Sequence, residues 1–546
     1  MPDRLDLTSS DSMARHVADR AADSPTQTAL ISAGGNLTYA ELEAKSNGCA
    51  VGLAGRGLSR GDRVVLLVTP GPELMILVFA LIKLGVVPVL IDPGIGRHHL
   101  RRCIDQAEPC AFIGVAKAVW AARLLGWGKR SVRLWVCVQR MGPPGSRRLS
   151  RLIEEGNRAG SFQPVPLRPD ETAAIVFTSG STGPPKGVVY THRMFSAQAE
   201  LLRSAFDIRP GEVDLATFPL FALFDPALRM TTVFPKMDFT RPGSVNPRHI
   251  TGLIEERRVT HMFGSPALLN RVGRYGAEQQ LKLPSLRRVL SAGAPVSAVI
   301  AERFASLLGP DAELFTPYGA TEALPVCSIS LTERTRLAGT DAGRGVCIGR
   351  PLPGVSVAII PIDDEPVLDW TETQPVSPGT VGELVVWGAN VSPSYFRNPG
   401  ADRLAKIVTS DGEIRHRMGD LGYFDKEGRI WFCGRKSHRV VTEDRTLFSV
   451  CCEGVFNRHP AVFRSALVGV GTAPRRRPVI CLELEPELRG GDRGRLMEEL
   501  RELAGRYEAT RGIESFLVHP GFPVDIRHNA KIGREKLARW AEGQKS

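Results

Sequence analysis

The sequence lacks a hydrophobic run long enough to cross a membrane. Its most apolar stretch, residues 74–82, is followed by Lys83, Gly85 and Pro88, whereas a membrane-spanning helix needs about 20 apolar residues. The N-terminus, MPDRLDLTSS, carries charges where an export signal needs an apolar segment. We therefore expect a cytoplasmic protein without a transmembrane segment, in which residues 74–82 belong to a buried helix that leads into a strand.

Cysteine pairs and long basic blocks are also missing. The ten cysteines are scattered without a CxxC pair, so we expect neither a zinc site nor a disulfide framework, and a reducing compartment suits them. The formal charge is +12, but basic clusters such as 475–477 are short and not interleaved with aromatic residues. We therefore expect no nucleic-acid partner. A solvated basic surface is the first interpretation, and attraction for anionic substrates, an acidic partner or a membrane face the second.

What the sequence does contain is an alternation of apolar strands and helices. Strands are predicted at 63–68, 86–91 and 174–177, with a helix over 71–84 between the first two. A chain of 546 residues is too long for one core. We predict an α/β fold, with a large N-terminal domain of mixed sheets and helices (residues 1–433) and a small, mobile α+β domain (residues 434–546).

One loop has an unusual composition. Residues 178–187, TSGSTGPPKG, follow a predicted strand and combine glycines, hydroxyl side chains and Lys186. Glycines let backbone N–H groups approach an anion, and the hydroxyls and the lysine add donors and charge, which suits a polyphosphate. Gly187 stands where a Walker A loop needs Ser or Thr. A mobile surface turn is the alternative interpretation.

This loop resembles the phosphate loop of adenylate-forming enzymes, the superfamily of acyl-CoA synthetases, adenylation domains and luciferases. Further segments resemble its other motifs in the family's order: LTYAEL at 37–42, YGATE at 318–322, MGD at 418–420, GR at 434–435 and NAKIGR at 529–534. Met418 departs from the usual threonine. The resemblance covers nearly the whole chain and implies ATP and Mg²⁺ as cofactors.

The resemblance also implies roles for individual residues. The catalytic residues would be Lys531, Thr321 and Glu322. Lys531 would serve adenylate formation, and Thr321 would contact the α-phosphate. Glu322 would hold Mg²⁺ together with Thr182. Asp420 would bind the ribose hydroxyls. The other ATP-binding residues would be Thr178, Ser179, Gly180, Ser181, Thr182, Gly183, Lys186, Gly293, Ala294, Pro295, Tyr318, Gly319, Ala320 and Arg435. Joining a carboxylate to AMP builds charge at the α-phosphate, which fixed cations and hydroxyl donors stabilise.

The acceptor of the activated acyl group is less plain. In the CoA-using branches a pivot Asp or Lys and a glycine turn follow the hinge, but here Ser437 and residues 442–444 (TED) stand in those places. The glutamate usual in this region is then Glu453. This departure argues against a thioester product.

Several strings, at 90–96, 218–228, 264–268, 315–322 and 431–436, resemble the bacterial olefin β-lactone synthetases. The resemblance implies a long-chain 2-alkyl-3-hydroxyalkanoic acid whose own 3-hydroxyl attacks the adenylate and closes a β-lactone, in olefin biosynthesis. Segment 218–228 would line the acyl pocket with Phe218, Phe221, Phe224 and Asp225, or it is ordinary core. Asp225 is either the base for the 3-hydroxyl or a turn residue, and His192 and His261 are expected to be structural.

Two other functions remain open. A long-chain fatty acyl-CoA synthetase or fatty acyl-AMP ligase keeps the fold and changes the acceptor. A non-catalytic nucleotide-binding protein would not need both Lys531 and Glu322. The resemblance further implies a complex with thiolase-like and hydrolase-like pathway enzymes, and a small domain that swings at Gly434–Arg435 to bring Lys531 to the nucleotide.

Overall fold

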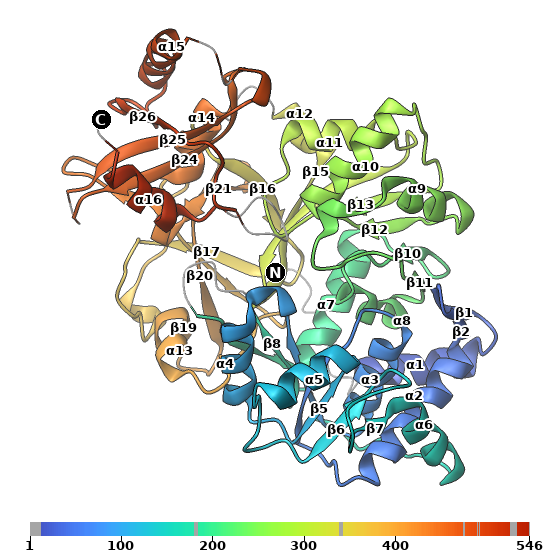
Figure 1. Ribbon diagram of the computed structural model, residues 1–546. Coiled ribbons are helices and arrows are strands. Elements are labelled where there is room, and N and C mark those ends of the chain that lie inside the picture. Colours follow the sequence, from blue (N-terminus) through green and yellow to red (C-terminus); the bar gives the residue numbers. More distant parts are fainter. Residues whose placement is uncertain are drawn as a thin grey trace.

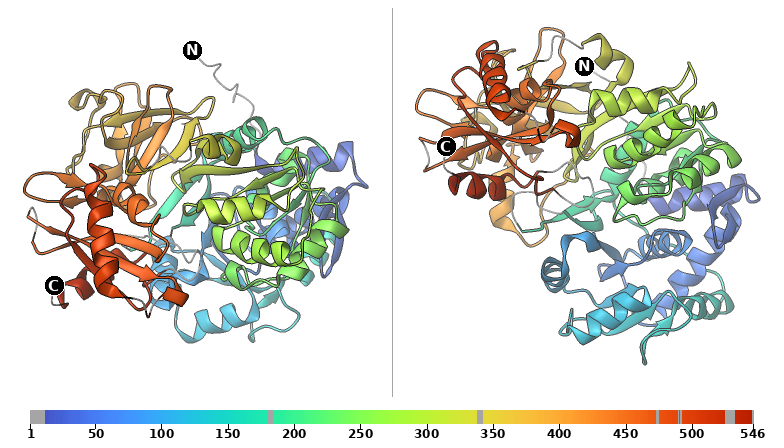
Figure 2. Two further views of the ribbon diagram at one scale, coloured as in Figure 1. Left: turned by 90° about the horizontal axis from the view of Figure 1, so that it is seen from above. Right: turned by 45° about the horizontal axis from the view of Figure 1, so that its top comes forward.

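The computed structural model describes residues 12–178, 184–337, 342–472, 475–488, 490, 492–524 and 532–544. Two large sheets and their helices form most of the molecule, and the C-terminal residues pack at one side of it (Figure 1). The tilted view separates this C-terminal part from the helices of the first sheet (Figure 2, right).

The first sheet has seven strands, which run parallel except where β9 returns antiparallel to β8. In spatial order they are β7 (Arg147–Arg148), β6 (Leu134–Cys137), β5 (Ala111–Gly114), β3 (Arg63–Leu67), β4 (Val87–Ile91), β8 (Thr172–Phe177) and β9 (Gly187–Thr191). The predicted strands at 63–68, 86–91 and 174–177 are confirmed as β3, β4 and β8. Their continuous apolar runs reflect burial on both faces of a parallel sheet.

Helices cover both faces of this sheet. One face packs against α4 (Arg97–Ala107) and α5 (Ala116–Leu124). The other packs against α1 (Met13–Asp23), α2 (Tyr39–Ala54), α3 (Pro72–Lys83) and α6 (Leu149–Arg158). The predicted helix at 71–84 is α3, whose residues 74–83 are all buried. Within the part of the chain that the structure describes, no helix combines the length and the apolar composition needed to span a bilayer.

The LTYAEL string is a helix start. Thr38 caps α2 by accepting from the Glu41 N–H, and the Glu41 carboxylate accepts from the Thr38 N–H at 2.8 Å. This capping box satisfies two of the N–H groups that a helix start leaves unpaired. The motif therefore has a folding role that is independent of any ligand.

The second sheet has fourteen strands among the described residues. Its parallel half contains β1 (Thr28–Ser32), β11 (Thr231–Val233), β10 (Val213–Leu215), β12 (His261–Phe263), β13 (Arg288–Leu290) and β14 (Glu313–Ala320), with β2 (Gly35–Thr38) antiparallel at the edge. The antiparallel half continues through β15 (Ala323–Ser330), β16 (Val346–Pro351), β21 (Ile430–Arg435), β20 (Ile414–Phe424), β18 (Gly382–Trp387) and β17 (Ser356–Ile360), with β19 (Lys406–Val408) on β20.

The helices that accompany the second sheet come between its strands in the chain. They are α7 (His192–Ala205), α8 (Asp225–Leu228), α9 (Pro247–Glu256), α10 (Pro266–Glu278), α11 (Ala298–Ala305), α12 (Leu331–Arg336) and α13 (Pro399–Ala405). Buried residues of α9, α10 and α11 form one core with β12, β13 and β14. Helix α7 instead shares the core of the seven-stranded sheet, so it joins the two sheets.

The C-terminal part is a small α+β unit. It contains β22 (Val440–Val441), β23 (Thr446–Leu447), α14 (Ser449–Phe456), β24 (Val462–Val470), β25 (Arg477–Leu484), α15 (Arg493–Gly505), β26 (Ser515–Val518) and α16 (Arg534–Glu542). Gly434 and Arg435 still belong to β21, where they pair with Leu421 and Asp420. The division at 433/434 stays a prediction.

Candidate active site

The YGATE segment forms the end of β14 and a tight turn into β15. A Cβ at Gly319 would approach the Ala323 carbonyl oxygen to 2.7 Å, so only glycine fits there. The Tyr190 hydroxyl of β9 donates to the Thr321 carbonyl at 2.8 Å, and the Ser392 N–H donates to the Glu322 carbonyl at 2.8 Å. The backbone of Thr321 and Glu322 is therefore fixed from two sides.

Tyr395 connects the phosphate-type loop to Glu322. Its hydroxyl donates to Oε1 of Glu322 at 2.7 Å, and its ring centroid lies 4.9 Å from Nζ of Lys186. The strand-like segment around Tyr395 pairs with β9, where the Phe396 N–H donates to the Gly187 carbonyl at 2.7 Å. The structure thus brings together Lys186 and Glu322, which the sequence assigned to the polyphosphate and to Mg²⁺.

A buried lysine lies behind this tyrosine. Lys406 is 6% exposed, donates to the Ser392 carbonyl at 2.5 Å and lies 5.6 Å from the Tyr395 ring centroid. Burial lowers the pKa of Lys406 to about 8, although Glu322 and Asp402 oppose this. Asp402 accepts from the Tyr395 N–H at 2.7 Å. Lys406 and Asp402 therefore help to fix the position of Tyr395.

Asp420 is the predicted ribose ligand and lies on β20. It is 3% exposed, accepts from the Tyr318 hydroxyl at 2.5 Å and has its Oδ1 3.1 Å from Nε of Arg435. Burial raises the pKa of Asp420, and Arg435 and Tyr318 oppose that rise. The charge of Asp420 in turn raises the pKa of Arg435. Both oxygens of the Asp420 carboxylate thus face protein partners, and its binding of the ribose diol stays a prediction.

The segment Gly293–Ala294–Pro295 follows β13 at the carboxyl end of the parallel strands, where ligands bind in open α/β sheets. Gly293 has a φ of 88°, in the left-handed region that favours glycine. The Ser291 N–H donates to the Phe315 carbonyl on β14 at 2.9 Å. The position agrees with the ATP-binding assignment of these three residues, which stays a prediction.

A series of aromatic rings leads from Tyr190, which bonds the Thr321 carbonyl, to the predicted acyl segment. Tyr190 lies 5.0 Å from Phe195, which lies 6.1 Å from Phe224. Phe221 stacks on Phe263 at 4.8 Å, and Phe218 lies 5.3 Å from the same ring. Because Tyr190 also holds the Thr321 carbonyl, the phenylalanine segment adjoins the predicted adenylation residues.

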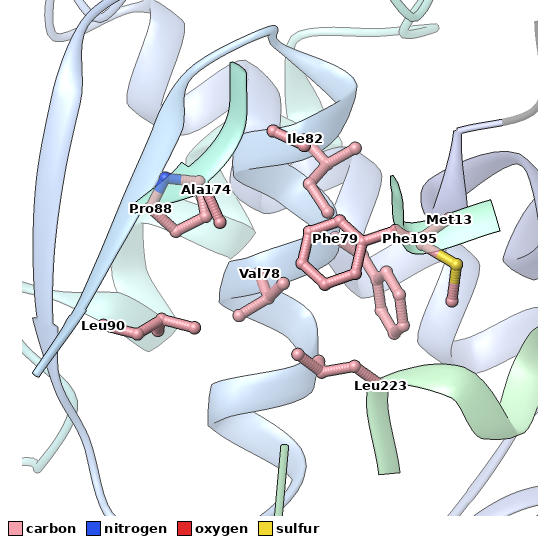
Figure 3. A pocket seen from close by; sticks show the side chains of 10 residues that line it. Met13, Val78, Phe79, Ile82, Pro88, Leu90, Ala174, Phe195 and Leu223 are labelled. Carbon is pink, nitrogen blue, oxygen red and sulfur yellow. The ribbon is translucent and has the colours of Figure 1, made fainter. Parts of the chain in front are cut away.

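A small cavity lies behind this segment (Figure 3). Its lining is entirely apolar and comes from α1, α3, β4, β8, α7 and the 3-10 turn Phe221–Phe224. Phe195 and Leu223, from α7 and that turn, point toward it with Val78 and Phe79 of α3 (Figure 3). This space is only about the size of one water molecule, so an alkyl chain would enter it only if the lining side chains moved.

Asp225 lies at the start of α8 and is buried. Its Oδ2 accepts from Oγ1 of Thr232 at 2.6 Å. Burial raises the pKa of Asp225 well above its ordinary value, and nearby Asp214 raises it further. Asp214 bonds His261 at 2.9 Å. Burial raises the pKa of Asp214 to about 8 and lowers that of His261 to about 3, so this pair is a hydrogen bond between neutral groups. The role of Asp225 as a base stays a prediction.

Lys531 and the loop residues Ser179, Gly180, Ser181, Thr182 and Gly183 lie outside the described residues. The flanks of the loop are closed by the Thr178 N–H, which donates to the Lys186 carbonyl at 3.0 Å. After Lys531, Ile532 bridges to Val524, and Arg534 pairs with the buried Glu453 at 2.9 Å. Glu453 thus anchors the start of α16.

Ion pairs hold the segment after β21, the predicted hinge, to the part of the chain around β17 and β18. Lys436 lies 3.0 Å from Glu383, and Arg439 lies 2.5 Å from Asp364. Ser437 lies between them in the 3-10 turn Lys436–His438. The TED turn between β22 and β23 is closed by the Arg445 N–H, which donates to Oγ1 of Thr442 at 3.2 Å.

Sequence reasoning missed Tyr395, Lys406 and Asp402. Tyr395 contacts Glu322 across 73 residues, and no local spacing reports such a contact. The available signal was the aromatic pair Tyr395–Phe396 in the segment after the strand 382–387. Its role emerges only when β9 places that segment beside the β14–β15 turn.

The metal prediction can be tested against the ligands present. Among the described residues, no group of three or more His, Cys, Asp or Glu side chains is arranged to hold a metal ion. Mg²⁺ commonly binds through one or two carboxylates together with substrate phosphates. Glu322, whose Oε1 is held by Tyr395, fits such a shared site.

Comparison with known proteins decides the family. The family model described as AMP-binding enzyme matches residues 17–396. This chain belongs to that family. It is accordingly an AMP-forming ligase, and ATP is one of its substrates.

Within the family, the chain is 49% identical over 515 residues to the olefin beta-lactone synthetase of Xanthomonas campestris pv. campestris, covering 93% of this chain and 91% of that protein. The olefin beta-lactone synthetase of Stenotrophomonas maltophilia is also 49% identical, with 93% and 92% covered. The solved amide bond synthetase McbA from Marinactinospora thermotolerans has a TM-score of 0.78 at 25% identity, with 97% and 99% covered.

Proposed function

We propose that this AMP-forming ligase is an ATP-dependent β-lactone synthetase for long-chain 2-alkyl-3-hydroxyalkanoic acids, in olefin biosynthesis. The observation that carries the proposal is that the Lys186–Tyr395–Glu322 group and the phenylalanine segment are neighbours. Tyr190 joins them, because it bonds the Thr321 carbonyl and packs on Phe195. The identity of 49% to two olefin beta-lactone synthetases supports the proposal.

In the first step, a carboxylate oxygen of the substrate attacks the α-phosphorus of ATP and pyrophosphate leaves. Lys186 and the loop bind the leaving phosphates, Asp420 holds the ribose, and Thr321 and Lys531 stabilise the charge at the α-phosphate. Mg²⁺ would supply charge neutralisation at the phosphates and would be held by Glu322 and Thr182. Tyr395 orients the Glu322 carboxylate.

In the second step, the substrate's own 3-hydroxyl oxygen attacks the acyl carbon. The bond from that carbon to the AMP oxygen breaks, the hydroxyl proton is released, and a four-membered lactone forms. Tethering replaces a second substrate, which makes attack effectively unimolecular. The closed TED turn and Ser437 at the hinge fit an enzyme that does not admit CoA.

The decisive experiment supplies ATP, magnesium and a 2-alkyl-3-hydroxy acid without CoA, and follows AMP, pyrophosphate and lactone by mass spectrometry. One lactone and one AMP are expected for each ATP. The matched control is the same acid without its 3-hydroxyl, which should form an adenylate and stop there. A thioester that appears only with CoA would instead favour the long-chain fatty acyl-CoA synthetase. Transfer to a carrier protein would favour a fatty acyl-AMP ligase.

The Lys531→Ala variant tests the catalytic assignment. Pyrophosphate release should be lost while ATP binding, measured by calorimetry, persists. Unchanged pyrophosphate release would remove Lys531 from the mechanism. The association with thiolase-like and hydrolase-like enzymes and the cytoplasmic location stay predictions, which co-purification and cell fractionation test.

A further inference from the structure

One segment of the chain carries only positive charge. Residues 109–153 contain no Asp or Glu and nine basic residues: Lys117, Arg123, Lys129, Arg130, Arg133, Arg140, Arg147, Arg148 and Arg151. They fold as β5, α5, β6, β7 and the start of α6, at the edge of the seven-stranded sheet that β7 closes. The charge is therefore concentrated at one edge of the molecule.

The outer face of α5 carries two large apolar side chains beside a lysine. Lys117, Trp120 and Leu124 follow each other at spacings of three and four residues, so they share one helix face. Trp120 is 45% exposed and Leu124 is 77% exposed. Val119 and Ala122, on the other side of the helix, are buried against the sheet. A surface helix ordinarily has polar residues on its outer face.

The loop after β6 extends this surface. Arg123 of α5 donates to the Pro144 carbonyl, and Sγ of Cys137 lies 3.7 Å from the Met141 carbonyl oxygen. The loop thus lies against the end of α5. Met141 is 81% exposed and Leu125 is 46% exposed. Trp120, Leu124, Leu125 and Met141 are four of the ten exposed large hydrophobic side chains in the described residues.

Most of the cations at this edge are uncompensated. Arg133 pairs with Asp62 and Arg151 pairs with Glu155. Within the described ranges of the chain, no ion pair is formed by six others: Lys117, Lys129, Arg130, Arg140, Arg147 and Arg148. Exposed apolar side chains among unpaired cations are the combination that favours the interface of an anionic bilayer, where tryptophan sits at headgroup level.

We propose that the surface formed by α5, the turn 125–130 that follows it and the loop 138–146 docks this enzyme on the anionic face of a lipid membrane. The cations attract the headgroups, and Trp120, Leu124, Leu125 and Met141 enter the boundary with the acyl chains. A purely acidic protein would engage the cations but leave these four apolar side chains without an apolar partner. If the proposed function holds, docking also brings the active site to the phase in which a long-chain substrate dissolves.

The test is co-sedimentation of the full-length protein with vesicles, without ATP or substrate. Vesicles of phosphatidylcholine with phosphatidylglycerol should bind the protein, and vesicles of phosphatidylcholine alone should bind it much less. Raising NaCl to about 0.5 M should release it, because the Debye length falls. Equal binding to both vesicles, or no binding to either, overturns the proposal, and no binding would leave an acidic protein as the partner class.

Matched variants locate the surface. Lys129→Gln with Arg130→Gln should weaken binding about 30-fold, since each basic residue near an anionic surface strengthens binding about fivefold. The control is Arg271→Gln with Arg274→Gln on α10, which removes the same charge from exposed positions elsewhere. Equal losses in both pairs would show that net charge alone is responsible, which overturns the proposal.

The apolar part has its own pair. Trp120→Gln with Leu124→Gln should lose at least tenfold in binding, whereas Leu404→Gln on α13, which is 52% exposed, should not. All variants change exposed side chains, and thermal unfolding checks that each is folded. Pyrophosphate release in detergent should be unaffected, so a failure of docking and a failure of the proposed function are measured separately.

Discussion

Two groups of carboxylates in this enzyme have opposite surroundings. Asp420 and Glu322 each accept a hydrogen bond from a tyrosine hydroxyl, and each has a cation nearby, Arg435 in one case and Lys186 beside Tyr395 in the other. Asp225 and Asp214 instead bond Thr232 and the neutral His261. The cations near Asp420 and Glu322 favour charged carboxylates that can act on a ligand. The surroundings of Asp225 and Asp214 favour protonated carboxyl groups within the core.

The largest effect should come from removing the charge at Asp420. Asp420→Asn should lower kcat/KM for ATP about 100-fold, because hydrogen bonds to a charged group contribute about 1.5–3 kcal/mol. Steady-state pyrophosphate release over a range of ATP concentrations measures this. The control is Asp411→Asn, an exposed aspartate on the loop before β20. An unchanged kcat/KM in Asp420→Asn would remove the ribose assignment.

Tyr395→Phe should have a smaller effect of about tenfold on adenylation. It deletes one hydrogen bond to Glu322, worth about 0.5–1.5 kcal/mol, and keeps the ring that faces Lys186. The Mg²⁺ concentration for half-maximal activity should rise, because Glu322 loses its fixed orientation. Tyr275→Phe on α10 should leave that concentration unchanged. If Tyr395→Phe lowers activity without this change in Mg²⁺ dependence, its role is structural.

Asp225→Asn should change lactone formation less than about threefold, because a carboxyl that is already neutral loses little when it becomes an amide. The Thr232 hydroxyl keeps an acceptor in this variant. The measurement is lactone and adenylate formation in a single turnover. Adenylate that accumulates without closing to the lactone would instead identify Asp225 as the base and break the comparison.

The fourth prediction concerns stability and pH. The pKa of Asp214 is about 8 in the folded protein and ordinarily 3.8, so between these values the folded state holds a proton that the unfolded state has released. The free energy of unfolding therefore falls as the pH rises through this range. Asp214→Asn lacks this loss and should gain stability relative to the wild type, by up to about 1.4 kcal/mol per pH unit.

Urea unfolding of both proteins between about pH 5 and pH 7.5 measures the difference. The window lies below the pKa of most free thiols, so the ten cysteines contribute little. A constant difference across the range would mean that Asp214 is ionised in the fold and that the two groups of carboxylates are alike.

Local patterns predicted the parts of the fold and site that depend on neighbours in sequence. The apolar run at 63–68 and the predicted helix at 71–84 are β3 and α3. Both were predictable because an element that is buried on all sides has an uninterrupted run of apolar residues. Tyr318, Thr321 and Glu322 were assigned together by the resemblance to one family motif, and the structure places them along one strand end and tight turn.

The rest required the tertiary structure. No pattern indicates that β15, β16 and β21 join the parallel strands into one sheet, since these pairings link distant segments. The same holds for Tyr395, which reaches Glu322 only after its segment has paired with β9. The sequence could not decide whether residues 218–228 line an acyl pocket or belong to the core. The physical reason is that Phe221 and Phe224 pack with other rings in either case.

The anchoring of the chain beside Lys531 has a consequence for how this enzyme can be altered. The Gly533 N–H donates to the Pro523 carbonyl at 2.7 Å, and Arg534 is fixed to Glu453 on α14. The chain that follows Lys531 is therefore held to its own domain. If the small domain swings at Gly434–Arg435 as predicted, substitutions around Ser437 should change the timing of catalysis without altering any residue assigned to the nucleotide.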